Sequence, residues 1–126
     1  MNNINLLYID PEELMFTVIE QEAKVRGYKT VMCAKNVEEA LVIFSNAAFD
    51  GKAVVIIGTY NLPSMSCVEL VQKIKKIRDV PIIVCTFLCR DQIITHELFE
   101  NGVARILDKP FSLRSIFQHI EELMDS

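Results

Sequence analysis

Alternation of apolar runs with helical patterns is the feature that most constrains the fold of this chain. Five short apolar runs are each followed by a segment whose apolar residues have helical spacing. This order is typical of a parallel sheet covered on both faces by helices, because parallel neighbours need a crossover connection. We predict strands at residues 5–9, 30–33, 54–57, 82–85 and 105–107.

Signals for the start of a helix follow the predicted strands. Asp10 offers an N-cap, with Pro11 at the first helical position. Asn36 and Ser66 each stand three residues before a glutamate, which is the spacing of a capping box. We expect Ser112 to cap the last helix in the same way.

The spacing of apolar residues also predicts which side of each helix is buried. For the second, third and fifth helices, the predicted core residues are Val37, Ala40, Leu41 and Phe44, then Leu70, Val71, Ile74 and Ile77, and finally Leu113, Ile116, Phe117, Ile120 and Met124. The fourth helix, near residues 91–101, spreads its apolar residues around more than one side. We expect part of that surface to be left for a partner.

Length and composition favour one globular domain over residues 1–126. A chain of 126 residues has room for a single core, and 51% hydrophobic with 24% charged residues is a globular balance. Residues 1–7 lack the pattern of a signal peptide, and no apolar run reaches the ~20 residues of a membrane span. We therefore expect a cytoplasmic protein without a membrane contact.

Charge and cysteine usage exclude two further classes of function. The net charge is −4 with scattered basic residues, so nucleic acid is not an expected direct partner. The four cysteines form no Cys-x-x-Cys pair, and two histidines give no zinc-ligand spacing. We expect reduced thiols and no metal centre.

The predicted topology places the functional site at one edge of the sheet. Five βα units with right-handed crossovers favour a doubly wound, flavodoxin-like α/β fold with strand order 2-1-3-4-5 and helices on both faces. Ligands of such folds bind beyond the carboxyl ends of the strands. The candidate site residues are therefore Asp10, Pro11, Glu12, Gly58, Thr59, Thr86 and Lys109.

Several short motifs carry a resemblance to a known family. They are Leu6-Leu7-Tyr8-Ile9-Asp10, Asn61-Leu62-Pro63 with Met65, Val80-Pro81-Ile82-Ile83-Val84 with Thr86, Gly102-Val103-Ala104, and Leu107 with Lys109-Pro110-Phe111. In this order, they resemble the landmarks of response regulator receiver domains of the chemotaxis-protein-Y type. The resemblance implies two-component signal transduction, in which a histidine kinase transfers a phosphoryl group to an aspartate after the third strand. It also implies that acids bind Mg²⁺ and that Thr86 and Lys109 contact the phosphoryl oxygens.

The sequence departs from this family where the chemistry occurs. The acceptor position falls on Thr59 when counted back from Pro63, and on Gly58 when counted forward from the third strand, and neither residue is an acid. Pro11 stands in place of the second acid after the first strand. We therefore predict a degenerate phosphorylation pocket with weak or absent Mg²⁺ binding, no cofactor and no enzymatic activity.

Two further expectations concern the same pocket. Receivers carry an aromatic switch residue three places before the lysine, and this chain has Ile106 there, so the usual relay is expected to be disabled. Lys109 is expected to pair with Asp10 as its nearest opposite charge. The resemblance also implies a cis bond between Lys109 and Pro110.

The leading hypothesis is an atypical, phosphorylation-independent receiver that acts by binding a protein, either a histidine kinase or a downstream regulator. The expected contact surface is the fourth helix, fifth strand and fifth helix, with His96, Phe99, Arg105 and His119 as candidate residues. The chain itself is expected to be a monomer or a weak homodimer.

Two alternatives remain. The first is a phosphotransfer regulator that uses Asp10, Thr86 and Lys109 with an unconventional acceptor. The second is a flavin or nucleotide carrier, which the acidic Asp10-Pro11-Glu12 loop disfavours because it repels phosphate and lacks an amide.

Overall fold

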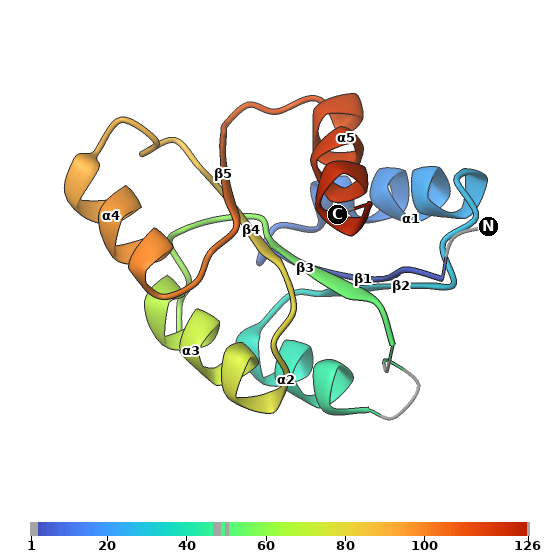
Figure 1. Cartoon of the computed structure of the whole chain (residues 1–126), viewed down its shortest axis with the longest axis horizontal. Coiled ribbons are helices and arrows are strands. Elements are labelled where there is room, and N and C mark those ends of the chain that lie inside the picture. The colour runs from blue at the N-terminus through green and yellow to red at the C-terminus, as the bar shows by residue number, and fades with distance from the viewer. Residues whose placement is uncertain (1–2, 47–48, 50, 126) are drawn as a thin grey trace.

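The computed structural model describes residues 3–46, 49 and 51–125 as a single sheet with helices on both faces (Figure 1). Five parallel strands lie in the order β2-β1-β3-β4-β5, which confirms the predicted topology. They are β1 Asn5–Ile9, β2 Thr30–Ala34, β3 Ala53–Ile57, β4 Ile82–Thr86 and β5 Arg105–Asp108. The helices are a 3₁₀ turn, η1 Glu13–Met15, then α1 Phe16–Val25, α2 Val37–Ser45, α3 Cys67–Ile77, α4 Gln92–Glu100 and α5 Leu113–Met124.

Two apolar clusters hold the layers together, one on each face of the sheet. The helices α2, α3 and α4 pack on one cluster, and α1 and α5 pack on the other (Figure 1). Every residue of β1, β3 and β4 is buried, and all except Asn5 and Thr86 are apolar, as is typical of strands buried on both faces. Side chains of alternating residues along β1 enter opposite clusters, Leu7 and Ile9 one and Leu6 and Tyr8 the other.

Three of the predicted caps are confirmed. The side chains of Asn36, Ser66 and Ser112 each accept a hydrogen bond from the backbone N–H three residues further on. Asp91 caps α4 by accepting from the backbone N–H groups of Ile93 and Ile94 at 3.0 and 3.2 Å. Each bond satisfies a donor that has no partner inside the helix.

The predicted start of the first helix is wrong. Asp10 does not cap it and Pro11 is not its first residue, because helical structure begins only at Glu13 and the α-helix at Phe16. Residues 11 and 12 form a bend instead. The Asp10 carboxylate folds back onto the N–H of Glu12, two residues ahead, which is a local turn that competes with a helix.

The buried sides of the helices follow the prediction with one exception. Ile77 is 45% exposed because α3 ends there, so its side chain passes the edge of the core. In α4, only Leu98 is buried, whereas Ile93 is 83% and Phe99 52% exposed. The expectation that α4 leaves apolar surface uncovered is therefore confirmed.

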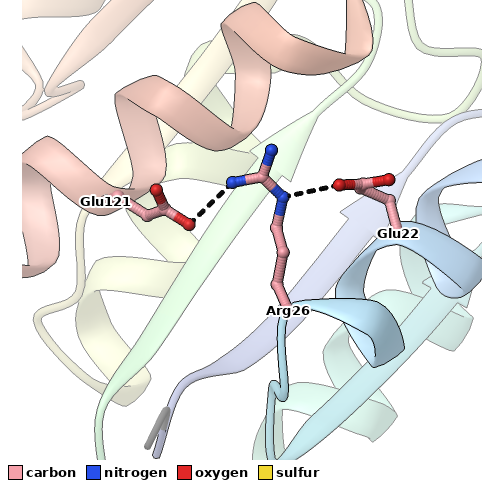
Figure 2. A network of polar contacts seen from close by, with 3 residues as sticks. All are labelled: Glu22, Arg26 and Glu121. Carbon is pink, nitrogen blue, oxygen red and sulfur yellow. Dashed lines mark hydrogen bonds and ion pairs between the residues drawn. The ribbon is translucent and has the colours of Figure 1, made fainter.

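A polar contact joins the first and last helices above their shared cluster. Arg26, at the end of α1, donates to Glu22 at 2.7 Å and to Glu121 of α5 at 2.8 Å (Figure 2). The guanidinium also lies over the Phe117 ring, 4.9 Å from its centroid. Arg26 therefore fixes α1 against α5 through both charge and stacking.

No helix within the described ranges is long and apolar enough to cross a bilayer.

Candidate functional site

Asp10 is a buried carboxylate at the carboxyl end of β1. It is only 6% exposed, and each of its oxygens accepts one hydrogen bond. The Tyr8 hydroxyl donates to Oδ2 at 3.2 Å, and the backbone N–H of Glu12 donates to Oδ1 at 2.9 Å. A carboxylate has about four lone-pair sites, so half of its acceptor capacity remains unused by these bonds.

Tyr8 reaches Asp10 because Asp10 follows directly after β1, two positions beyond Tyr8, so that the two side chains project to the same side. The ring is fully buried and meets Phe16 edge-on, with centroids 6.0 Å apart. Burial raises the pKa of the Tyr8 phenol far above its usual value, and the neighbouring Asp10 charge adds to this effect. The hydroxyl is therefore a permanent hydrogen-bond donor to Asp10 near neutral pH.

Gly58 faces this pair from the neighbouring strand β3. Its backbone N–H donates to the Ile9 carbonyl at 2.7 Å, which extends the β1–β3 ladder by one residue. A Cβ atom at position 58 would lie 2.7 Å from both Asp10 Oδ2 and the Tyr8 hydroxyl oxygen. Only glycine fits at this position while Tyr8 and Asp10 keep their places.

Lys109 follows β5 and is held next to β4. Its backbone N–H donates to the Thr86 carbonyl at 3.1 Å, and the Lys109–Pro110 bond is cis, as the resemblance implies. The predicted ion pair between Lys109 and Asp10 is wrong: within the described part of the chain, no salt bridge joins them. The Lys109 ammonium lies over the Phe87 ring instead, 5.5 Å from its centroid, while Asp10 is satisfied by Tyr8 and Glu12.

The remaining predicted pocket residues occupy different surroundings. Thr86 is buried, and its hydroxyl accepts from the Leu88 N–H at 3.0 Å, which fixes the loop after β4. Thr59 is half-buried just beyond β3. Ile106 packs with the cluster beneath α2, α3 and α4, on the face of the sheet opposite to Tyr8.

A hollow of about 280 Å³ opens beside Asp10. Its polar lining is Tyr8, Asp10, Glu12 and Lys109, and its apolar walls are Leu14, Met15, Phe87 and Phe111. The structure therefore brings Asp10, Glu12 and Lys109 together as predicted from the topology. The surrounding wall is mostly apolar. Apolar side chains provide no ligands for a hydrated metal ion or a phosphate group.

The donor set around Asp10 does not fit a magnesium site. Mg²⁺ prefers several hard oxygen ligands in octahedral geometry, whereas Pro11 and Gly58 offer no side-chain oxygen. Across residues 3–46, 49 and 51–125, no group of three or more His, Cys, Asp or Glu side chains is placed to hold a metal ion. Asp10 is the one acid of the hollow that is buried.

Sequence reasoning missed five residues of this site. Tyr8 was grouped with the apolar strand, although its position two residues before Asp10 was a usable signal. Leu14 and Met15 line the hollow from the short η1 turn, and Phe87 and Phe111 line it from loops. No periodicity marks such positions, since their side chains are directed by the fold and not by a repeating element.

The residues proposed for partner contact lie together only in part. Arg105 of β5 contacts His119 Nδ1 and Glu122 of α5, both at 2.8 Å. His96 pairs with Glu100 along α4, and Phe99 is exposed on the same helix. Each thus lies on one of the three predicted elements, with Arg105 and His119 in direct contact.

The fold and this edge site define the class of the protein: a doubly wound α/β domain with its polar site at the carboxyl ends of β1, β4 and β5. The family model for the response regulator receiver domain matches residues 6–121, and the chain belongs to that family. Receiver domains are signalling domains of two-component systems and interact with other proteins. The predicted family is therefore confirmed.

Two curated proteins illustrate this relationship. The chain is 31% identical over 120 residues to a probable transcriptional regulator, ycf27, of Cyanidium caldarium, and covers 46% of its length. It is 28% identical over 125 residues to a chemotaxis protein CheY homolog of Campylobacter jejuni, and covers 92% of that protein. The chain thus spans about half of the first relative and nearly all of the second.

Solved structures agree on the fold. A CheY-like receiver domain protein from Methanospirillum hungatei aligns with a TM-score of 0.81 at 22% identity, covering 99% of this chain and 95% of that one. A two-component response regulator from Clostridium difficile gives 0.81 at 24% identity, covering 97% and 96%. A structure described as an adenylate cyclase from Rhodopirellula baltica gives 0.80 at 19% identity, covering 99% and 89%. At these identities, the likeness concerns the fold alone.

Proposed function

We propose that this chain is a receiver domain that signals without being phosphorylated, by binding another protein. The observation that carries the proposal is the close packing of Tyr8, Asp10 and Gly58: Tyr8 donates to Asp10, and both lie against Gly58. Gly58 has no space for a side chain, and Thr59, the other candidate acceptor position, carries a hydroxyl. A hydroxyl acceptor would need an adjacent base to lose its proton.

The same geometry supports weak or absent Mg²⁺ binding and the absence of a catalytic role. Phosphoryl transfer to a carboxylate depends on a metal that offsets the crowded negative charge. Here the Tyr8 hydroxyl already occupies one oxygen of Asp10, and Pro11 supplies no ligand. A pocket held in one conformation by these contacts, and not phosphorylated, undergoes no change of charge that could alter the binding surface.

Partner contact is assigned to α4, β5 and α5. Exposed Ile93 and Phe99 give α4 an apolar surface, and the Arg105–His119 contact adds directional polar groups on β5 and α5. Apolar anchors with a polar surround are typical of protein interfaces. A histidine kinase or a downstream regulator would be the partner, and the chain would act as a monomer or weak homodimer.

The test is incubation with acetyl phosphate and Mg²⁺, followed by intact-mass measurement. We expect no gain of a phosphoryl group and no saturable rise of the melting temperature with millimolar Mg²⁺, because a ligand stabilises only in proportion to its binding. A receiver that carries the acceptor aspartate, treated in parallel, must gain mass. Stoichiometric mass gain by this chain would favour the alternative in which Asp10, Thr86 and Lys109 serve an unconventional acceptor.

A further inference from the structure

The hollow beside Asp10 has an apolar rim that the proposed function leaves unexplained. Leu14 is 82% and Phe87 73% exposed, and both line the same hollow although one follows β1 and the other follows β4. Single exposed apolar residues are ordinary on protein surfaces. Two of them across a hollow with a buried carboxylate form a site with an apolar entrance and a polar floor.

The charge of the hollow favours a cation. Asp10 and Glu12 contribute two carboxylates against the one ammonium of Lys109. Lys109 forms no ion pair with Asp10, and each Asp10 oxygen accepts only one hydrogen bond from the described residues. The floor therefore retains acceptor capacity and a net negative charge.

The apolar walls then select the kind of cation. A strongly hydrated ammonium loses water at a cost in such a place, whereas a guanidinium is weakly hydrated, planar, and stacks on aromatic faces. The guanidinium can also donate two parallel hydrogen bonds to a carboxylate. An arginine side chain has this head together with an apolar stem that would lie between Leu14 and Phe87.

We propose that the hollow receives an arginine side chain from a protein partner, with its stem against Leu14 and Phe87 and its guanidinium at Asp10 and Glu12. This rests on the proposed function, because a phosphoryl group in the pocket would fill the same place. The absence of phosphorylation and the binding of an arginine are tested by different measurements, so one can be refuted without the other. Mass gain with acetyl phosphate tests the first, and recognition of a guanidinium tests the second.

The experiment is an NMR titration of the ¹⁵N-labelled full chain with n-butylguanidinium, which mimics the arginine stem and head. We expect saturable shifts of the Glu12, Gly58 and Leu88 amides, with a dissociation constant of about 1–20 mM for so small a ligand. The neutral analogue n-butylurea should bind at least about fivefold more weakly, since it lacks the charge. Pentanoate should give no saturable shift.

Variants locate the site. Leu14→Ser and Phe87→Ser should each weaken n-butylguanidinium binding by about threefold or more, through loss of the apolar wall. Val42→Ser is the matched control, because Val42 is 71% exposed on α2, away from the hollow, and its replacement should change nothing. Lys109→Met should strengthen binding, since it removes the one repelling charge.

Three results would overturn the proposal. The first is an absence of saturable shifts at the hollow up to ten times the expected dissociation constant. The second is equal binding of n-butylguanidinium and n-butylurea. The third is tighter binding of pentanoate that disappears in Lys109→Met, which would make Lys109 the anchor and the hollow an anion site.

Discussion

The Tyr8 side chain fills the space next to Gly58, where β1 and β3 end. The Tyr8 hydroxyl lies where a Cβ atom of residue 58 would come within 2.7 Å of it, and Asp10 Oδ2 is equally close to that position. The three residues therefore depend on one another, and a change at one alters the space of the other two.

Gly58→Ala tests this dependence. We expect a loss of about 1–3 kcal/mol in the free energy of unfolding, because the added methyl group forces a packed strand or the Tyr8 ring to move. Urea denaturation of the variant measures this loss. In a Tyr8→Phe background, the same substitution should cost roughly 1 kcal/mol less, since the 2.7 Å contact with the Tyr8 hydroxyl oxygen is gone. Equal costs in both backgrounds would show that the hydroxyl does not limit the space.

Tyr8→Phe alone should lower stability by about 1 kcal/mol, the usual net value of one hydrogen bond. The variant keeps the ring and its edge-on contact with Phe16, so the loss reports only the bond to Asp10. Tyr28→Phe is a useful comparison, because the Tyr28 hydroxyl is buried without a hydrogen-bond partner among the described residues. Thermal denaturation should show a smaller effect, or a gain, for Tyr28→Phe.

At the scale of the elements, α4 differs from the other helices in how it is held. It contributes a single buried side chain, Leu98, whereas α2 buries three of its residues and α3 four. Tertiary packing supplies most of the stability of a protein helix. The cap at Asp91 should therefore matter more for the local order of α4 than the equivalent cap does for α2.

Asp91→Ala should open α4 locally. We expect hydrogen exchange of the amides of residues 92–100 to rise by roughly fivefold, which corresponds to about 1 kcal/mol for a lost cap. Asn36→Ala is the control, because α2 has a comparable cap but more buried surface. Mass spectrometry of the exchanged protein resolves both helices. Unchanged exchange in α4, or an equal local rise in α2, would contradict the argument.

The elements themselves were largely predictable from the sequence, and the reasons are specific. The five strands are confirmed to within one residue at each end, since strands buried on both faces appear as apolar runs. Asn36 and Ser66 indicated where α2 and α3 begin, because each stands three residues before a glutamate, as in a capping box. The first helix was misplaced because Asp10 forms a turn with Glu12, and the choice between a cap and a turn depends on burial that the sequence does not show.

The site was predictable in its location and less so in its contacts. Topology alone brings Asp10 and Lys109 to one edge of the sheet, and both line the hollow. Which partner each charge takes was not predictable, because Lys109 lies over the exposed ring of Phe87 and Asp10 is satisfied by Tyr8. Both outcomes depend on side-chain directions that only the folded chain fixes.

At the scale of the whole molecule, buried thiols and phenols make stability sensitive to alkaline pH. Burial raises the pKa of Cys67 and of Cys85 to about 12. In the unfolded chain, these thiols ionise near pH 8.5, so the folded state retains protons that the unfolded state loses. The stabilising contribution is complete below the unfolded pKa and is lost as pH rises through the folded pKa.

The free energy of unfolding should therefore fall between pH 7.5 and 10, by roughly 1–2 kcal/mol for each fully buried thiol. Cys67→Ala should flatten this dependence, because one of the titrating groups is removed. Val71→Ala, a truncation at another fully buried position of α3, should lower stability equally at both pH values. Urea midpoints measured at the two pH values provide the comparison, and parallel slopes for both variants would refute the assignment to Cys67.

The contact of α1 with α5 also has a consequence in time. Arg26 can form its contact only after Glu121 has been made, and the cluster containing Tyr8 is complete only after Ile116, Phe117 and Ile120 have been made. A ribosome adds about 5–20 residues per second, so the 88 residues from Val25 to Leu113 (113 − 25) take roughly 4–18 seconds. Throughout that interval, the strands already made have no cover from α5. A chain whose synthesis stops before residue 113 would have only α1 on that face, and the part that α5 covers would be open to aggregation.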